Sequence, residues 1–221
     1  LILVAQETTI YGVDLYGEKS LHRLLRELCK ISGIRWIRIL YCYPEEIDDN
    51  LIQVMKEEPK ICHYLDLPIQ HASTEILGRM GRRTSREDLE EIIGKLRREI
   101  PDIAIRTTLI TGFPGETKEQ HEELMDFVDQ MEFDRLGVFT YSPEEGTPAA
   151  GMEGQVPEEV KEDRQAELME LQQEIAFDLA EDMIGREVLV MIEGKVADEN
   201  AYVGRTYKDA PNVDGLIFVN T

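Results

Sequence analysis

The chain has 221 residues, enough for one large domain and a small one, and it is 42% hydrophobic and 31% charged, like an ordinary globular protein. Its 45 acidic and 24 basic residues give a formal net charge of −21, which argues against a nucleic-acid binder because phosphates attract basic surfaces. A basic partner fits this charge, although the charge can also serve solubility alone. No run of eighteen apolar residues and no signal peptide is visible, so we expect no association with a membrane.

Strands and helices alternate through the first two thirds of the chain. Residues 1–5 form an apolar run with no turn, cap or initiator methionine before it, which predicts a strand entered in mid-protein and hence a fragment of a longer chain. This alternation predicts an α/β fold with parallel strands, a partial, open barrel that one upstream strand would extend to six strands. The other predicted strands are 35–42, 63–69, 103–111 and 135–141, and the helices are 18–32, 44–57, 73–80, 85–99 and 117–131.

The pattern changes after residue 141. Residues 142–156 contain three glycines and two prolines and predict a linker or lid. A long helix with ten acidic and two basic residues is predicted at 157–182, and short alternating stretches at 186–193, 200–207 and 214–219 predict antiparallel strands of an incomplete small β-barrel. The chain therefore divides into a partial barrel (1–156), an acidic linking helix (157–183) and a small β domain (184–221).

The three cysteines do not form a recognisable metal motif. Cys29, Cys42 and Cys62 are separated by 13 and 20 positions, and neither spacing matches a zinc or iron–sulfur site. We interpret them as reduced thiols of a cytoplasmic protein. Because an iron–sulfur cluster needs several thiolates that converge on iron, residues 1–221 are not expected to hold one by themselves.

Polar or glycine-rich residues follow every predicted strand. In parallel α/β barrels, ligands bind at the edge where the carboxyl ends of the strands meet. A single polar residue there, such as His71, is more often an ordinary loop group than a proton carrier, but five such ends together favour a functional surface. They are Gln6–Thr9, Tyr41–Pro44, Pro68–Ser73, Thr111–Thr117 and Thr140–Pro143.

The segment Gly112–Thr117 allows two interpretations. Its glycines let the backbone approach a ligand closely, and N–H groups at the start of the next helix attract a carboxylate or phosphate. A tight turn followed by a Thr117 helix cap explains the same residues at least as well. The segment is not a nucleotide-binding P-loop, because no Gly-Lys-Ser/Thr follows it.

Several strings together resemble the methylthiotransferase branch of the radical-SAM superfamily, over residues 1 to about 182. They are Ala5–Thr9, Tyr11–Tyr16, Leu67–Ser73, Gly112–Thr117, Phe139–Ser142 and Gly146–Ala150. From about residue 186 the chain resembles a truncated TRAM domain, which is a small β-barrel. Six acidic and four basic residues leave 183–221 at a net charge of −2, whereas an RNA-binding TRAM domain should be basic.

Within that branch, the chain is most similar to the enzymes that modify an aspartate of a small-subunit ribosomal protein. Relatives that modify tRNA typically have Asn at the position of Glu7 and Ser at the position of His71, whereas the ribosomal-protein enzymes usually have Asp at Glu7. The resemblance therefore implies a basic ribosomal protein as partner and only weak binding to tRNA. A tRNA-adenosine methylthiotransferase and a non-catalytic protein-binding module on a barrel scaffold remain as alternatives.

The resemblance also implies the cofactors, namely S-adenosylmethionine and two [4Fe–4S] clusters whose ligands lie outside residues 1–221, so that this segment is inactive by itself. In the family, a 5′-deoxyadenosyl radical takes hydrogen from an unactivated carbon, and sulfur and methyl are then delivered. The cofactor-binding residues implied here are Thr108, Ile110, Gly112, Gly115, Glu116, Tyr141 and Ser142. On the substrate side the resemblance places Gln6, Gln70, His71 and Arg106, and we expect Arg106 to pair with a carboxylate; no catalytic residue or metal ligand is assigned.

Overall fold

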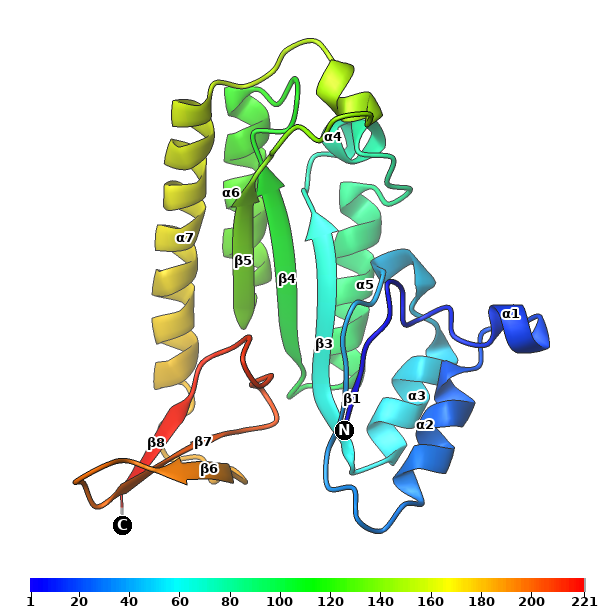
Figure 1. Ribbon diagram of the computed structural model, residues 1–221, viewed down its shortest axis with the longest axis vertical. Coiled ribbons are helices and arrows are strands. Elements are labelled where there is room, and N and C mark those ends of the chain that lie inside the picture. The colour runs from blue at the N-terminus through cyan, green and yellow to red at the C-terminus, as the bar shows by residue number, and fades with distance from the viewer. Residues whose placement is uncertain (221) are drawn as a thin grey trace.

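The computed structural model describes residues 1–220 and contains two sheets (Figure 1). All strands of the larger sheet are parallel and follow the order of the sequence, whereas the smaller sheet is antiparallel. The predicted α/β fold followed by a small antiparallel sheet is therefore confirmed. The larger sheet consists of β1 (Ile2–Leu3), β2 (Ile37–Ile39), β3 (Ile61–Gln70), β4 (Ala104–Thr111) and β5 (Arg135–Thr140), and the smaller of β6 (Met191–Lys195), β7 (Ala201–Arg205) and β8 (Ile217–Asn220).

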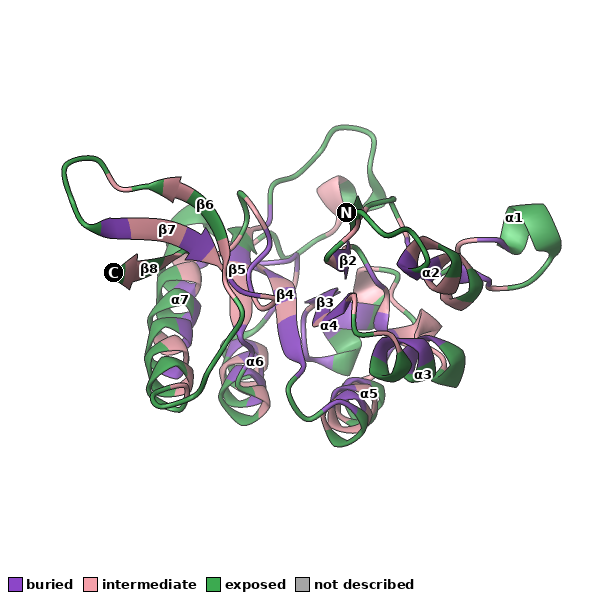
Figure 2. Ribbon diagram, turned by 90° about the horizontal axis from the view of Figure 1, so that it is seen from below, coloured by how far each residue is buried: buried purple, intermediate pink, exposed green. Residues whose placement is uncertain are grey.

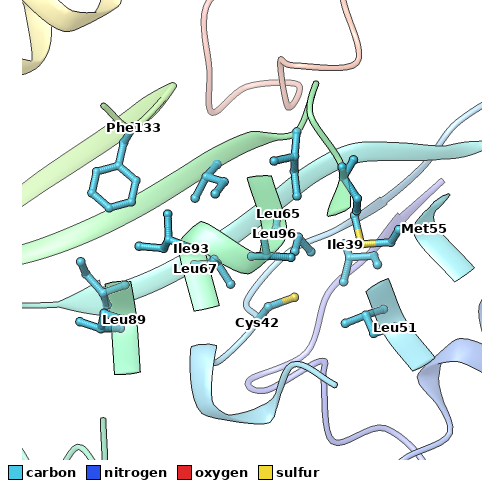
Figure 3. Packing of buried hydrophobic residues seen from close by; sticks show 14 of the residues in the cluster. Ile39, Cys42, Leu51, Met55, Leu65, Leu67, Leu89, Ile93, Leu96 and Phe133 are labelled. Carbon is cyan, nitrogen blue, oxygen red and sulfur yellow. The ribbon is translucent and has the colours of Figure 1, made fainter. Parts of the chain in front are cut away.

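The long helices form one layer on a single face of the larger sheet, and the opposite face is not covered by helices (Figure 2). The core lies between the sheet and this layer (Figure 3). Strand residues such as Ile39 and Leu65 belong to one cluster with Leu89, Ile93 and Leu96 of a single helix. Within the described residues, no helix is both long and apolar enough to cross a membrane. The helices of the layer are α2 (Leu21–Cys29), α3 (Asp49–Glu57), α5 (Arg86–Glu99), α6 (Lys118–Met131) and α7 (Glu158–Glu181).

Capping residues decide where the helices begin. Ser85 and Thr117 each accept a hydrogen bond from the backbone three residues later, in complete capping boxes that open α5 and α6. The predicted helix at 44–57 is instead split, since a 3-10 turn η1 (Pro44–Glu46) ends at the extended residue Ile47. The Asp48 side chain then caps α3, so the polar cap rather than the proline sets the start of that helix.

Two predicted regions differ from the structure. β1 and β2 are only 2 and 3 residues long, shorter than the runs predicted at 1–5 and 35–42. In the smaller sheet, the first strand begins at Met191 and not at residue 186. Met191 pairs with Arg205, the last residue of β7, so residues 186–190 lie beyond the end of their neighbouring strand.

The loop between β7 and β8 closes the lower end of the uncovered face (Figure 1). Arg38 of β2 donates hydrogen bonds to the carbonyls of Tyr207 (2.7 Å) and Asp209 (2.9 Å). The hydroxyl of Tyr64 on β3 donates to the Asp214 carboxylate at 2.7 Å. The 206–214 loop is therefore part of the base of the partial barrel, although it lies in the C-terminal part of the sequence.

Candidate functional site

The carboxyl ends of β3, β4 and β5 meet at one edge of the sheet (Figure 1). The main chain ties the last two together, because the N–H of Tyr141 donates to the carbonyl of Thr111 at 2.9 Å. Residues 142–156, predicted as a linker or lid, cross above these ends and reach α4 (Thr74–Arg79) through the 3-10 turn η2 (Pro148–Gly151). The edge is thus bounded by β-strand ends below and by this segment above.

The loop 112–116, which follows β4, is closed by its own carboxylate. One oxygen of Glu116, Oε2, accepts hydrogen bonds from the N–H groups of Gly112 (2.6 Å) and Phe113 (3.1 Å). These two N–H groups are therefore already bonded within the loop. The tight turn followed by a Thr117 cap, one of the two interpretations from the sequence, describes the geometry of the segment.

Two cations of α7 hold this loop from outside the sheet. Arg164 Nη1 lies 2.9 Å from Glu116 Oε1 and 3.2 Å from the Glu116 carbonyl. Lys161 Nζ donates to the Tyr141 carbonyl at 2.8 Å, and its methylene chain packs so closely on Gly112 that a Cβ there would collide with it. Burial raises the pKa of Glu116, and Arg164 and the two backbone N–H groups oppose this rise.

Two histidines face the same carboxylate. His71 is fully buried, and its Nδ1 accepts from the Ser73 N–H at 2.9 Å, so the proton of the neutral ring lies on Nε2, 3.8 Å from Glu116 Oε2. Burial lowers the pKa of His71 to about 3, so the ring is neutral near pH 7. His121 of α6 places Nδ1 4.0 Å from Glu116 Oε1 and bonds Glu167 through Nε2 at 2.8 Å.

The predicted substrate-side residues lie in different surroundings. Arg106 pairs with Asp66 at 2.7 Å and approaches Asp214 at 3.6 Å, so its carboxylate partners in the structure belong to this chain. Gln6 is exposed, whereas Gln70 has a positive φ of 73° and a buried Oε1 without a hydrogen-bond partner in the described part of the chain. His71 is fully buried, with its Nε2 3.8 Å from Glu116 Oε2 of the loop.

Sequence reasoning missed several residues around this loop and on the uncovered face of the sheet. Asp66 was not singled out, although it is the register partner of Arg106 on the neighbouring strand. Arg164, Lys161 and His121 were also missed as site residues. Helical periodicity was a usable signal for His121, because it shares one face of α6 with Leu124 and Val128.

A family model for the radical SAM superfamily matches residues 3–128 of the chain. The chain belongs to the radical SAM superfamily. A TRAM domain model matches residues 184–221. Membership implies S-adenosylmethionine and a [4Fe–4S] cluster as cofactors, and it confirms the resemblance seen in the sequence.

Curated relatives extend this finding. The chain is 67% identical over 221 residues to "Ribosomal protein uS12 methylthiotransferase RimO" of Lachnoclostridium phytofermentans. The alignment covers 100% of this chain and 50% of the relative. It is 54% identical over 219 residues to the protein of the same name from Clostridium perfringens, covering 99% of this chain and 49% of the relative. The chain thus spans about half the length of the curated relatives it matches.

Among solved structures, coproporphyrinogen III oxidase HemN from Escherichia coli, a radical SAM enzyme, superposes with a TM-score of 0.51 at 21% identity. The match covers 86% of this chain and 50% of that chain. At this identity the likeness concerns the fold alone, and it agrees with the parallel sheet and its single helical layer.

The residues at the edge fit S-adenosylmethionine. Burial alternates along β4, so Arg106, Thr108 and Ile110 share the face of the sheet that carries no helices. Tyr141 packs edge-on against Phe113, with ring centroids 5.1 Å apart, and its buried hydroxyl has no partner among residues 1–220. An apolar wall with unpartnered polar atoms suits a flat heteroaromatic group such as adenine. No group of three or more His, Cys, Asp or Glu side chains that could hold a metal occurs among the described residues.

Proposed function

We propose that the full-length protein containing this chain is a radical-SAM methylthiotransferase that adds a methylthio group to an aspartate of ribosomal protein uS12, at an unactivated carbon. The observation that carries the proposal is the 67% identity to RimO over all 221 residues. A second [4Fe–4S] cluster, with ligands outside residues 1–221, and a cytoplasmic location belong to the same proposal.

In this proposal the chain binds and orients the cofactor. Bound S-adenosylmethionine and its iron–sulfur cluster supply the radical and the methyl group. Thr108 and Ile110 line the adenine, and the unpartnered Tyr141 hydroxyl offers it a hydrogen bond. Gly112, Gly115 and Glu116 act through the fixed shape of their loop, because the Gly112 N–H is already bonded to the Glu116 carboxylate. Ser142, which is exposed after β5, lies at the rim.

The substrate aspartate is proposed to enter over the uncovered face of the sheet. Arg106 lies on that face, and its longer contact, 3.6 Å to Asp214, is the one that a substrate carboxylate can replace. Gln70 offers the buried Oε1 as a hydrogen-bond acceptor, and Gln6 lies exposed at the end of the first strand. His71, neutral and buried, contributes to this site through the 112–116 loop, whose Glu116 carboxylate lies 3.8 Å from its Nε2.

The surface of α7 supports a basic partner. The ten acidic residues of 157–182 are all exposed, while the only two basic residues of that segment, Lys161 and Arg164, are buried. The outward face of the helix therefore has a large excess of acidic residues. Such a surface speeds the encounter with a lysine- and arginine-rich protein and disfavours tRNA.

The full-length protein, loaded with its clusters under anaerobic conditions, tests the proposal. With S-adenosylmethionine and a reductant, we expect uS12 to gain, at an aspartate, the mass of one methylthio group less the hydrogen that it replaces. An otherwise identical uS12 with Asn at that position should gain none. Modification of tRNA in place of uS12 would support the tRNA-directed alternative. A protein that neither binds S-adenosylmethionine nor modifies either substrate would be a non-catalytic module.

A further inference from the structure

We infer that Arg164 is a positioning residue for cofactor binding, since it locks the Glu116 carboxylate against the 112–116 loop and so makes α7 part of the S-adenosylmethionine site. This inference rests on the proposed function, because it takes the loop as a wall of that site. It concerns a residue outside the barrel strands, on a helix that the sequence marks only as acidic.

The contacts form one continuous connection from α7 to the loop. A single guanidinium nitrogen of Arg164 contacts both the carboxylate (2.9 Å) and the main-chain carbonyl (3.2 Å) of Glu116. The other carboxylate oxygen accepts hydrogen bonds from the N–H groups of Gly112 and Phe113, and these two bonds fix the backbone at the start of the loop. The side chains of Glu116 and Arg164 are buried, so water does not replace these contacts.

In the described part of the chain, no other cation makes a hydrogen bond to the Glu116 carboxylate. His71, after β3, is neutral and 3.8 Å away, and His121 of α6 is 4.0 Å away and bonds Glu167 through its other nitrogen. Both distances exceed those of hydrogen bonds. Lys161 lies over Gly112 but directs its ammonium to Tyr141 and Glu158. Without Arg164, Glu116 would be a buried carboxylate with no cation within hydrogen-bond distance.

The effect is expected to be local to the cofactor wall. Phe113, whose N–H is bonded to Glu116, packs against Tyr141, and the Gly115 N–H donates to the Gly154 carbonyl at 2.7 Å in the segment above the loop. A change in Glu116 therefore moves the wall and its cover. The sheet core, which consists of other residues, is left in place.

Arg164→Met in the full-length protein tests the inference through binding of S-adenosylmethionine, measured by calorimetry without turnover from about pH 6 to about pH 9. Affinity is expressed as the ratio of the variant to the wild-type dissociation constant, so that any effect of the protonation of S-adenosylmethionine itself cancels. We expect a ratio of about ten or more at high pH, because an unpaired buried carboxylate is expelled. The ratio should fall toward acid pH, because a proton on Glu116 removes the unpaired charge.

The matched control is Gln172→Leu on the same helix. Gln172 is also buried, and its amide donates to the Phe133 carbonyl at 2.7 Å, away from the loop. A purely structural effect of α7 would appear equally in both variants, so we expect the control ratio to stay within about twofold of one at every pH. The double variant Glu116→Gln/Arg164→Met, which lacks the unpaired charge, should recover most of the affinity and lose the pH dependence.

The possible results separate this inference from the proposed function. Failure of the wild-type protein to bind S-adenosylmethionine would count against the proposed function itself. Tight wild-type binding with an unchanged Arg164→Met ratio, or a double variant as weak as the single one, would overturn the positioning role alone. Should Arg164→Met not fold, Arg164→Gln, which keeps a donor for the Glu116 carbonyl, goes through the same titration with the same criteria.

Discussion

The close packing of Lys161 on Gly112 leads to a prediction about stability. Gly112 has a φ of +72°, in the left-handed region, and a Cβ there would collide with Cγ of Lys161. Gly112→Ala therefore meets two separate costs. The left-handed conformation costs alanine about 1–2 kcal/mol. Displacement of Lys161 breaks its buried hydrogen bond to the Tyr141 carbonyl, which adds about 1.5–3 kcal/mol because the donor is charged.

Gly146→Ala is the matched control, because it separates the two costs. Gly146 has a φ of +83°, but nothing lies within 4 Å of the position of a Cβ. We expect urea denaturation to show a loss of about 2.5–5 kcal/mol in the free energy of unfolding for Gly112→Ala and about 1–2 kcal/mol for Gly146→Ala. In a Lys161→Ala background, the additional loss from Gly112→Ala should shrink to that of the control. Equal losses for the two glycine variants would refute this reasoning.

Three further predictions concern other parts of the structure. Asp214→Ala leaves two buried donors without an acceptor and should lower the free energy of unfolding by about 1–3 kcal/mol. It should also speed amide hydrogen exchange in 206–214, whereas Asp214→Asn should have a smaller effect. Because the pKa of His71 is lowered in the folded protein, folding favours the neutral ring, and the free energy of unfolding should fall as the pH drops below 6.5, the ordinary pKa of histidine. Urea titrations at several pH values should show a smaller fall for His71→Asn. Replacing Glu170, Glu174 and Asp178 with amides should slow association with uS12 and flatten its salt dependence in stopped-flow mixing, whereas the same number of changes on α5 should not.

Local patterns in the sequence were sufficient for most of the fold. The order of the parallel strands follows from alternation with helices, and the starts of α5 and α6 follow from Ser85 and Thr117 as caps. The split of the predicted helix at 44–57 was missed because Pro44 suggested an early start, whereas Ile47 and Asp48 are extended and the Asp48 side chain caps a new helix. Local signals compete there, and the cap prevails.

The candidate site was less accessible from the sequence, because its contacts join distant positions. Arg164 and Glu116 are 48 residues apart, and nothing near either residue indicates the other. The pairing of Asp66 with Arg106 was within reach, since the two strands are neighbours and the residues are in register. The orientation of α7 could not be read from periodicity either, because polar side chains as well as apolar ones occupy its buried face.

That inward face explains why α7 is so acidic outside. A buried basic side chain is stable only where hydrogen bonds and opposite charges compensate for its burial. Lys161 and Arg164 both have such partners at the strand ends. Arg164 is turned inward and Lys161 contacts only Glu158 among these acids, so the two cations of the helix offset one of its ten exposed carboxylates. Outer acids that make no ion pair in the described residues, such as Glu170, Glu174 and Asp178, are thus separate from the inner face. Neutralising them should alter the encounter with a basic protein, whereas changing Arg164 should alter the cofactor wall. A variant of the outer face that weakened S-adenosylmethionine binding as strongly as Arg164→Met would contradict this separation.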